Sequence, residues 1–151
     1  MYKHILVAVN ESSASKRALE EAIKLAGAQK AQLRLINVFD QSLGNYGEYG
    51  WSSSAKTQQE LDLAAQKAVS ILEEASQLCR EAGLEVQTDM PHIVNASIVD
   101  KILEEAGRWP ADLIVMGTHG RTGVQRLLLG SVAMGVVQGA SVPVMLIREH
   151  E

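Results

Sequence analysis

The chain has 151 residues, of which 46% are hydrophobic and 21% are charged, and its formal net charge is −4. This length predicts one globular domain over residues 1–151, and the mildly acidic composition, without a run of lysine or arginine, argues against nucleic acid as the main partner. No apolar stretch approaches the roughly 18 residues that cross a membrane, and the N-terminal one is too short for a signal peptide, so we expect a cytoplasmic protein without membrane insertion.

The N-terminal segment alternates between strand and helix patterns. The apolar residues 4–9 predict a strand that is buried on both faces. Ser12 or Ser13 can cap the following helix, in which apolar residues recur at helical spacing as far as about Gly27, its expected end. Residues 32–39 predict the second strand. A helix between two strands is the connection that parallel strands require.

Residues 40–55 interrupt this pattern. They are rich in glycine and serine and contain three aromatic residues, Tyr46, Tyr49 and Trp51. We expect a long surface loop without regular structure. The aromatic residues favour a lid or a partner contact over disorder.

The rest of the chain continues the alternation. The expected elements are a long amphipathic helix over 57–82 that stops at Gly83, an edge strand over 84–90, a helix capped by Asn95 or Ser97 and closed by Trp109 and Pro110, an apolar strand over 112–117, a short helix over 131–138 and a final strand over 142–147. Cys79 lies on the apolar face of the long helix, where we expect a buried, unreactive thiol. The pattern predicts an α/β fold: a single-domain, open, parallel five-stranded sheet with helices on both faces.

The segment "GTHGRTGVQRLLLGS" begins at Gly117, directly after an apolar strand. Its glycines allow backbone amides to approach an anion, and Gly130 and Ser131 open the next helix, whose first amides and dipole favour phosphate. A glycine-rich turn also connects strands and helices in proteins that bind nothing. Arg121 and Arg126 can either pair with phosphates or be solvated. We interpret the segment as a candidate phosphate site.

No catalytic or metal-binding constellation stands out in the sequence. The four histidines lack zinc spacing, and His119, inside the glycine-rich segment, is more simply a loop residue than a catalytic acid. Adjacent glutamates on helices, such as Glu104 and Glu105, point about 100° apart and are interpreted as solvated faces. We therefore expect no catalytic residues, no metal ligands and a protein that is not an enzyme.

The spacing of the glycine-rich segment, G-x2-G-x9-G-[ST], resembles the ATP-binding signature of the universal stress protein (UspA) family. The similarity extends over "ILVAVNESSASKRALEEAIKLA", "LRLINV", "ADLIVMGTHGRTGVQRLLLGSVA" and "VPVMLI". It implies a Rossmann-like, adenine nucleotide alpha hydrolase-like domain of strand order 3-2-1-4-5. It also implies a regulatory or stress-response role, with ATP, AMP or ADP bound together with Mg²⁺ or Mn²⁺. The alternatives are a nucleotide-independent protein-interaction module and a slow ATPase.

The resemblance also implies a set of binding residues. The phosphates would lie on the glycine motif and the amide that follows it, and the adenosine would lie between the ends of the first two strands. The candidate residues are Ala8, Asn10, Val38, Met116, Gly117, His119, Gly120, Arg121, Gly130, Ser131 and Val132. Asn10 stands where the family often has an aspartate, and Ala133 where some nucleotide binders have a threonine. A homodimer or homotetramer through the apolar edge strand 142–148 and a regulatory partner protein are also expected.

Overall fold

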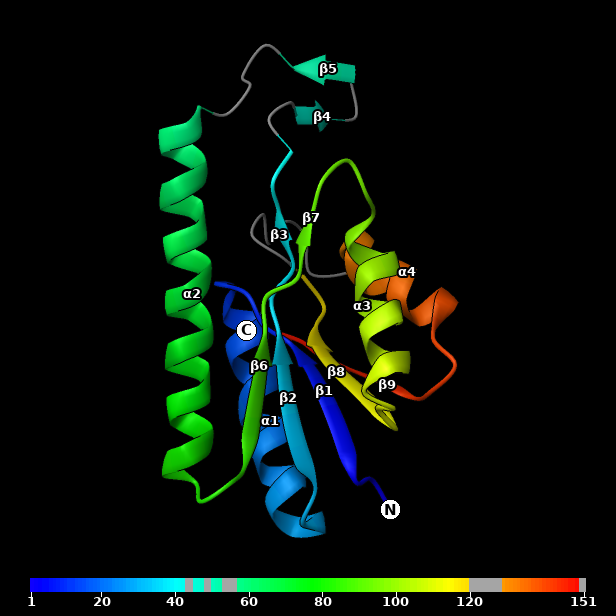
Figure 1. Ribbon diagram of the computed structural model, residues 1–151. Coiled ribbons are helices and arrows are strands. Elements are labelled where there is room, and N and C mark those ends of the chain that lie inside the picture. Colours follow the sequence, from blue (N-terminus) through cyan, green and yellow to red (C-terminus); the bar gives the residue numbers. More distant parts are fainter. Residues whose placement is uncertain (43–44, 48–49, 53–56, 120–128, 150–151) are drawn as a thin grey trace.

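Five parallel strands form an open sheet between two layers of helices in the computed structural model (Figure 1). The structure describes residues 1–42, 45–47, 50–52, 57–119 and 129–149, with the backbone alone for 45–47 and 50–52. The sheet order is β6-β2-β1-β8-β9, with β1 at His4–Ala8, β2 at Gln32–Ile36, β6 at Val86–Asp89, β8 at Leu113–Gly117 and β9 at Val144–Ile147. Numbered in chain order, these five strands run 3-2-1-4-5, which confirms the expected topology.

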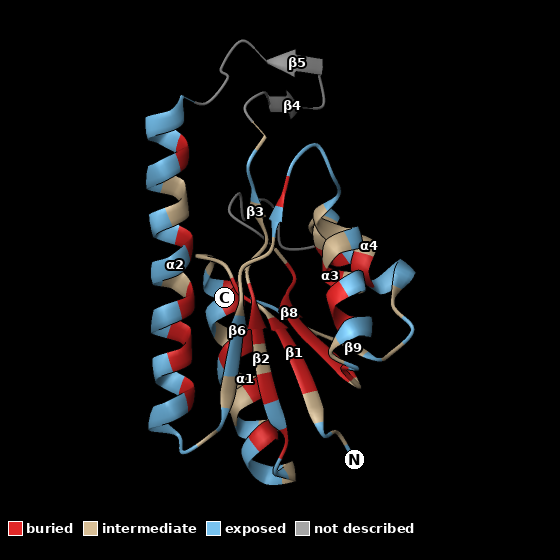
Figure 2. Cartoon of the chain, viewed as in Figure 1, coloured by how far each residue is buried: buried red, intermediate tan, exposed pale blue. Residues whose placement is uncertain are grey.

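The four helices cover the two faces of the sheet in pairs. They are α1 (Ser13–Gln29), α2 (Gln58–Glu81), α3 (Ile98–Arg108) and α4 (Ser131–Gly139). In β1, Ile5 and Val7 belong to one core, with residues of α1 and α2, whereas Leu6 belongs to a second core, with residues of α3 and α4. Buried positions therefore line both faces of the central strands (Figure 2), which explains their uninterrupted apolar sequence. Each fully buried aliphatic side chain stabilises the fold by about 1.5 to 3 kcal/mol.

The helix ends follow local sequence signals with one difference. Ser12 caps α1 and Ser97 caps α3, each accepting a hydrogen bond from a backbone amide three residues later. Gly83, at φ +77°, follows α2 as expected. The expected end of α1 at Gly27 is wrong. Because Ala26 is buried in the core, the helix runs on to Gln29, and Lys30 takes the left-handed conformation, with its amide on the Ala26 carbonyl.

Short strands occupy part of the segment that was expected to be an irregular loop. β4 (Asn45–Gly47) and β5 (Gly50–Ser52) form an antiparallel pair in which Tyr46 lies opposite Trp51, so that expectation is wrong. Aromatic residues favour strands, which explains the pairing of Tyr46 with Trp51. β3 (Phe39–Asp40) and β7 (His92–Ile93) form a further parallel pair. Tyr49 and the remainder of the predicted lid lie outside the described residues.

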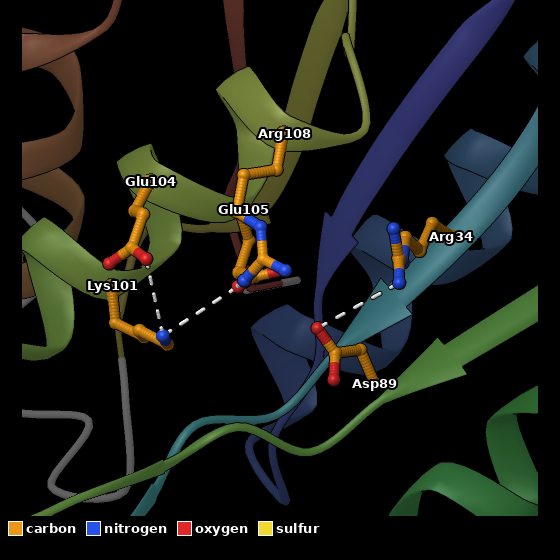
Figure 3. Close-up of polar contacts among 6 residues, drawn as sticks. All are labelled: Arg34, Asp89, Lys101, Glu104, Glu105 and Arg108. Atoms are coloured by element: carbon orange, nitrogen blue, oxygen red, sulfur yellow. Dashed lines mark hydrogen bonds and ion pairs between the residues drawn. The ribbon is translucent and has the colours of Figure 1, made fainter.

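One glutamate of α3 is buried, although the sequence predicted that it would be exposed to solvent. Glu105 was expected on a solvated face, but it is 4% exposed, whereas Glu104 is exposed. The Arg108 guanidinium lies 2.9 Å from the Glu105 carboxylate and the Lys101 ammonium lies 3.7 Å from it (Figure 3). Because burial of an unpaired carboxylate is costly, the ion pairs with these two cations are what allow Glu105 to be buried.

Cys79 lies fully buried on α2 within the core beneath α1, as expected. Burial raises the pKa of its thiol from 9.0 to about 11. The native state therefore favours the protonated thiol. This contribution to the free energy of unfolding is fully present below pH 9 and is lost as the pH rises towards about 11.

We expect the folded protein to resist alkylation of Cys79 by iodoacetamide at pH 8, because with a pKa near 11 only about one thiol in a thousand is ionised. Mass spectrometry of native and urea-unfolded samples measures this directly. The unfolded chain should be modified rapidly. Equal rates in the two samples would contradict the burial of this thiol.

Candidate functional site

The carboxyl ends of β1 and β8 lie side by side at one edge of the sheet. The two strands are adjacent and in register, with Val7 opposite Val115, so the chain leaves both strands at the same edge. The N-terminus of α1 and the N-terminus of α4 reach this edge as well. The Gly130 amide donates to the Thr118 carbonyl at 2.7 Å, and the Ser12 hydroxyl donates to the His119 carbonyl at 3.2 Å. Ligands of open parallel sheets bind at this kind of edge.

Most of the sequence-predicted residues lie at this edge. Ala8 ends β1, Val38 lies just beyond β2, and both side chains pack against the core under α3 and α4. The others that the structure places there are Asn10, Met116, Gly117, His119, Gly130, Ser131 and Val132. Gly120, Arg121 and Arg126 lie outside the described residues. These residues come from distant segments and meet because β1 pairs in register with both β2 and β8.

A compact hydrogen-bonded turn joins β1 to α1. The Asn10 amide donates to the Ser15 hydroxyl at 2.8 Å, and the Asn10 Oδ1 accepts from the Ser12 amide at 2.8 Å. The Ser12 hydroxyl in turn accepts from the Ser15 amide at 3.1 Å. Ser15 is 1% exposed, so its role is structural. The turn fixes the position of Asn10, whose Oδ1 accepts one hydrogen bond within the protein.

Gly117 allows α1 and β8 to approach closely. A Cβ atom built on Gly117 would lie 2.8 Å from the carbonyl carbon of Ala14 and 2.8 Å from the amide nitrogen of Ser15. Both atoms belong to the backbone of the first turn of α1, which has little freedom to move. A glycine at this position therefore sets the distance between the strand end and the helix N-terminus.

The N-terminus of α4 has no side-chain cap. Its N-cap is Gly130, at φ −62° and ψ 157°, and the first turn contains no acidic residue. The amides of Ser131, Val132 and Ala133 have no hydrogen-bond acceptor within the helix, as is true of the first amides of any α-helix. These amides, together with the positive end of the helix dipole, are suited to an anion. By contrast, α1, α2 and α3 are capped by Ser12, Thr57 and Ser97.

Two contacts at this edge were not identified from the sequence. The buried Thr118 places its hydroxyl 2.9 Å from Nδ1 of His119, which orients that ring at the end of β8. Glu11 forms an ion pair with Lys67 of α2. No sequence pattern could identify this pair, because the two residues are far apart in the chain. Both side chains are partly exposed, so the pair contributes at most about 1 kcal/mol.

The described part of the chain contains no group of three or more histidine, cysteine, aspartate or glutamate side chains placed to hold a metal ion. Within the same ranges, no helix is long and apolar enough to span a membrane. The features at the sheet edge are a hydrogen-bonded turn, a close strand–helix contact and an uncapped helix. The fold is that of a doubly wound α/β protein, and these features meet at the carboxyl ends of its central strands.

The family follows from comparison with known proteins. A model described as the universal stress protein family matches residues 1–148. Universal stress protein A homolog 2 from Coxiella burnetii is 37% identical, with 97% of this chain and 95% of the relative covered. Universal stress protein MJ0531 from Methanocaldococcus jannaschii is 33% identical, with 99% of this chain and 84% of the relative covered. The chain belongs to the universal stress protein family.

Solved structures share the fold. A universal stress protein in complex with cAMP has a TM-score of 0.69 at 24% identity, with 99% of each chain covered. One from Archaeoglobus fulgidus in complex with dAMP has a TM-score of 0.68 at 23% identity, with 97% of this chain and 98% of the other covered. A family protein from Arabidopsis thaliana with AMP bound has a TM-score of 0.67 at 20% identity, with 98% and 92% covered.

Proposed function

We propose that this protein binds an adenine nucleotide, ATP or its products ADP and AMP, at the carboxyl edge of β1 and β8. It would act as a nucleotide-responsive module in stress adaptation. The observation that carries the proposal is the uncapped N-terminus of α4, whose Gly130 amide is anchored 2.7 Å from the Thr118 carbonyl at the end of β8. The family members crystallised with AMP, dAMP and cAMP support an adenine nucleotide as the ligand.

The phosphates would bind to the backbone at the start of α4. The amides of Ser131 and Val132 would donate to phosphate oxygens, and Gly130 would leave the approach open because it has no side chain. Each charge-assisted hydrogen bond contributes about 1.5 to 3 kcal/mol, so three or four give micromolar affinity after the cost of ordering. Mg²⁺ or Mn²⁺ would bind with the nucleotide, and the phosphates and water would supply its ligands.

The ribose would bind at the turn after β1. The Oδ1 of Asn10 already accepts the Ser12 amide and keeps one further lone pair, whereas Nδ2 carries two donors, so Nδ2 is the main group of this side chain for a ribose hydroxyl. An amide donates to the hydroxyl oxygen, whereas the aspartate common in the family would accept from it. The adenosine would therefore be held by a neutral contact, without a charge-assisted hydrogen bond to its ribose.

The proposal is tested by gentle purification, denaturation and mass spectrometry of the released small molecules, followed by calorimetry with ATP and Mg²⁺. We expect either a copurified adenine nucleotide or a micromolar dissociation constant. A protein that carries no nucleotide and gives no heat would favour the ligand-independent interaction module. We further propose that the protein is not an enzyme, so phosphate release from ATP should equal the protein-free rate.

We also propose a two-fold dimer through β9. This strand forms one edge of the sheet, and all four of its apolar residues are partly exposed. The carbonyls of Pro143 and Ile147 accept from β8, so the backbone groups of Met145, two residues from each, also face β8. The backbone groups of Val144 and Leu146 face outward, where a second copy can pair with them.

Leu146→Pro should therefore convert the dimer into a monomer in light scattering, because proline removes an outward donor and leaves the bonds to β8 intact. Leu146→Ala is the matched control, since it shortens the same side chain but keeps the amide, and it should remain dimeric. A dimer that persists in the proline variant would exclude β9 pairing as its basis.

A further inference from the structure

The terminal strand β6, on the side of the sheet opposite β9, lies beside a groove. This groove is separate from the proposed nucleotide site and from the proposed dimer interface. It is an open hollow of about 250 Å³ between α2 and β6, which we name the α2–β6 groove. It is lined by residues of α2, by one residue of β6 and by the residue that follows β6: Val69, Leu72, Glu73 and Ser76, then Thr88, then Met90. Val69 is 41% exposed, so an apolar surface is accessible at the rim.

The backbone of β6 is free to pair along this groove. β6 is the terminal strand of the sheet, next to β2 alone. The carbonyls of Glu85 and Asp89 accept from β2, and because backbone groups alternate along a strand, those of Val86 and Thr88 point away from the sheet. Thr88 is exposed, so α2 does not cover this edge. A free edge of this kind accepts an added strand.

The segment of the chain that carries the groove is acidic. Residues 57–89 contain seven carboxylates and two basic residues, a net charge of −5, which leaves the remainder of a chain of net charge −4 at +1. Glu73 lines the groove and Glu85 precedes β6. Asp89 lies 4.0 Å from Arg34 (Figure 3), which offsets its charge only in part. Two such edges would repel one another, which disfavours a second copy of this chain as the occupant.

We propose that the α2–β6 groove is the docking surface for an extended, basic segment of a partner protein that pairs with β6 as an added strand. The outward groups of Val86 and Thr88 would supply main-chain hydrogen bonds. Alternate apolar side chains of the segment would contact Val69 and Met90 in the groove, and the lysine or arginine residues between them, on the opposite face of the added strand, would face Glu85 and Asp89. This surface does not depend on nucleotide binding, so either proposal can fail alone.

The test uses isotope-labelled full-length protein and two short capped peptides, one alternating lysine with valine and one alternating glutamate with valine. We expect the lysine peptide to shift the amide resonances of residues 69–76 and 85–90, with binding that weakens as salt is raised. The glutamate peptide should shift neither segment. Equal binding of the two peptides, no shift with either, or shifts that map to β9 would overturn the proposal.

Two matched pairs of variants locate the contact. Thr88→Pro removes an outward amide without touching the bonds to β2 and should weaken the lysine peptide at least ten-fold, whereas Thr88→Val keeps that amide and should bind normally. Glu85→Lys should weaken binding several-fold, whereas Glu104→Lys, on α3, should not. If Thr88→Pro instead lowers the oligomeric mass, a second copy occupies the edge and the proposal is wrong.

Discussion

Gly117→Ala should lower the free energy of unfolding by about 3 kcal/mol, the upper part of the usual range for overpacking. The new Cβ would lie 2.8 Å from two backbone atoms of α1, the carbonyl carbon of Ala14 and the amide nitrogen of Ser15. Neither atom can move without shifting the first turn of the helix. The expected result is a lower urea midpoint with an unchanged denaturant slope.

Gly27→Ala is the matched control for this prediction. Gly27 lies in α1, is exposed, and has no atom within 4 Å of the position where a Cβ would be added. Alanine there should raise the free energy of unfolding by about 0.5 to 1 kcal/mol, because it reduces the entropy of the unfolded chain and favours the helix. If both variants were neutral, the close contact between β8 and α1 would not set the stability of this edge.

The same contact shows how far the sequence alone could define the site. Glycine spacing indicated Gly117 as part of a phosphate loop, and the structure places it at the sheet edge but packs it against Ala14 and Ser15. Sequence patterns are local, so they located the strand ends and helix starts. They could not show that the Ser12 hydroxyl reaches the His119 carbonyl, because that hydrogen bond depends on the register of β1 with β8.

The structure also differs from the sequence-based predictions in a buried charge and in two short strands. Glu105 was assigned to a solvated face because it is charged and adjacent to Glu104, although it follows Ile98 by seven residues and Ile102 by three and so lies on the apolar side of α3. The structure shows its carboxylate to be buried and paired with Arg108. All five strands of the main sheet, in contrast, were predicted, each one to three residues too long, and the central ones were clear because burial on both faces leaves a continuous hydrophobic run. The hairpin of β4 and β5 was missed because its strands are too short to show a period of two.

Gly130→Asp should change stability and nucleotide binding in opposite directions. The backbone at Gly130 is extended, at φ −62° and ψ 157°, which suits any residue, and aspartate is a good N-cap. Its carboxylate would accept from the first amides of α4 and interact with the helix dipole, so the nucleotide-free protein should gain about 0.3 to 1 kcal/mol. The same carboxylate would occupy the proposed phosphate position and repel the phosphates, so the affinity for ATP should fall at least about ten-fold, or 1.4 kcal/mol.

Gly130→Asn shows whether the effects of Gly130→Asp come from the charge or from the shape of the new side chain. Asparagine caps a helix as well as aspartate does but carries no charge, so it should give a similar thermal stability and a smaller loss of ATP affinity. Thermal unfolding without nucleotide and calorimetry with ATP and Mg²⁺ measure the two effects separately. If Gly130→Asp bound ATP as tightly as the unmodified protein, the phosphates would lie away from the start of α4. If it lost stability and binding together, the effect would be a general disruption of the edge, and the amides of Ser131 and Val132 would not be the phosphate ligands.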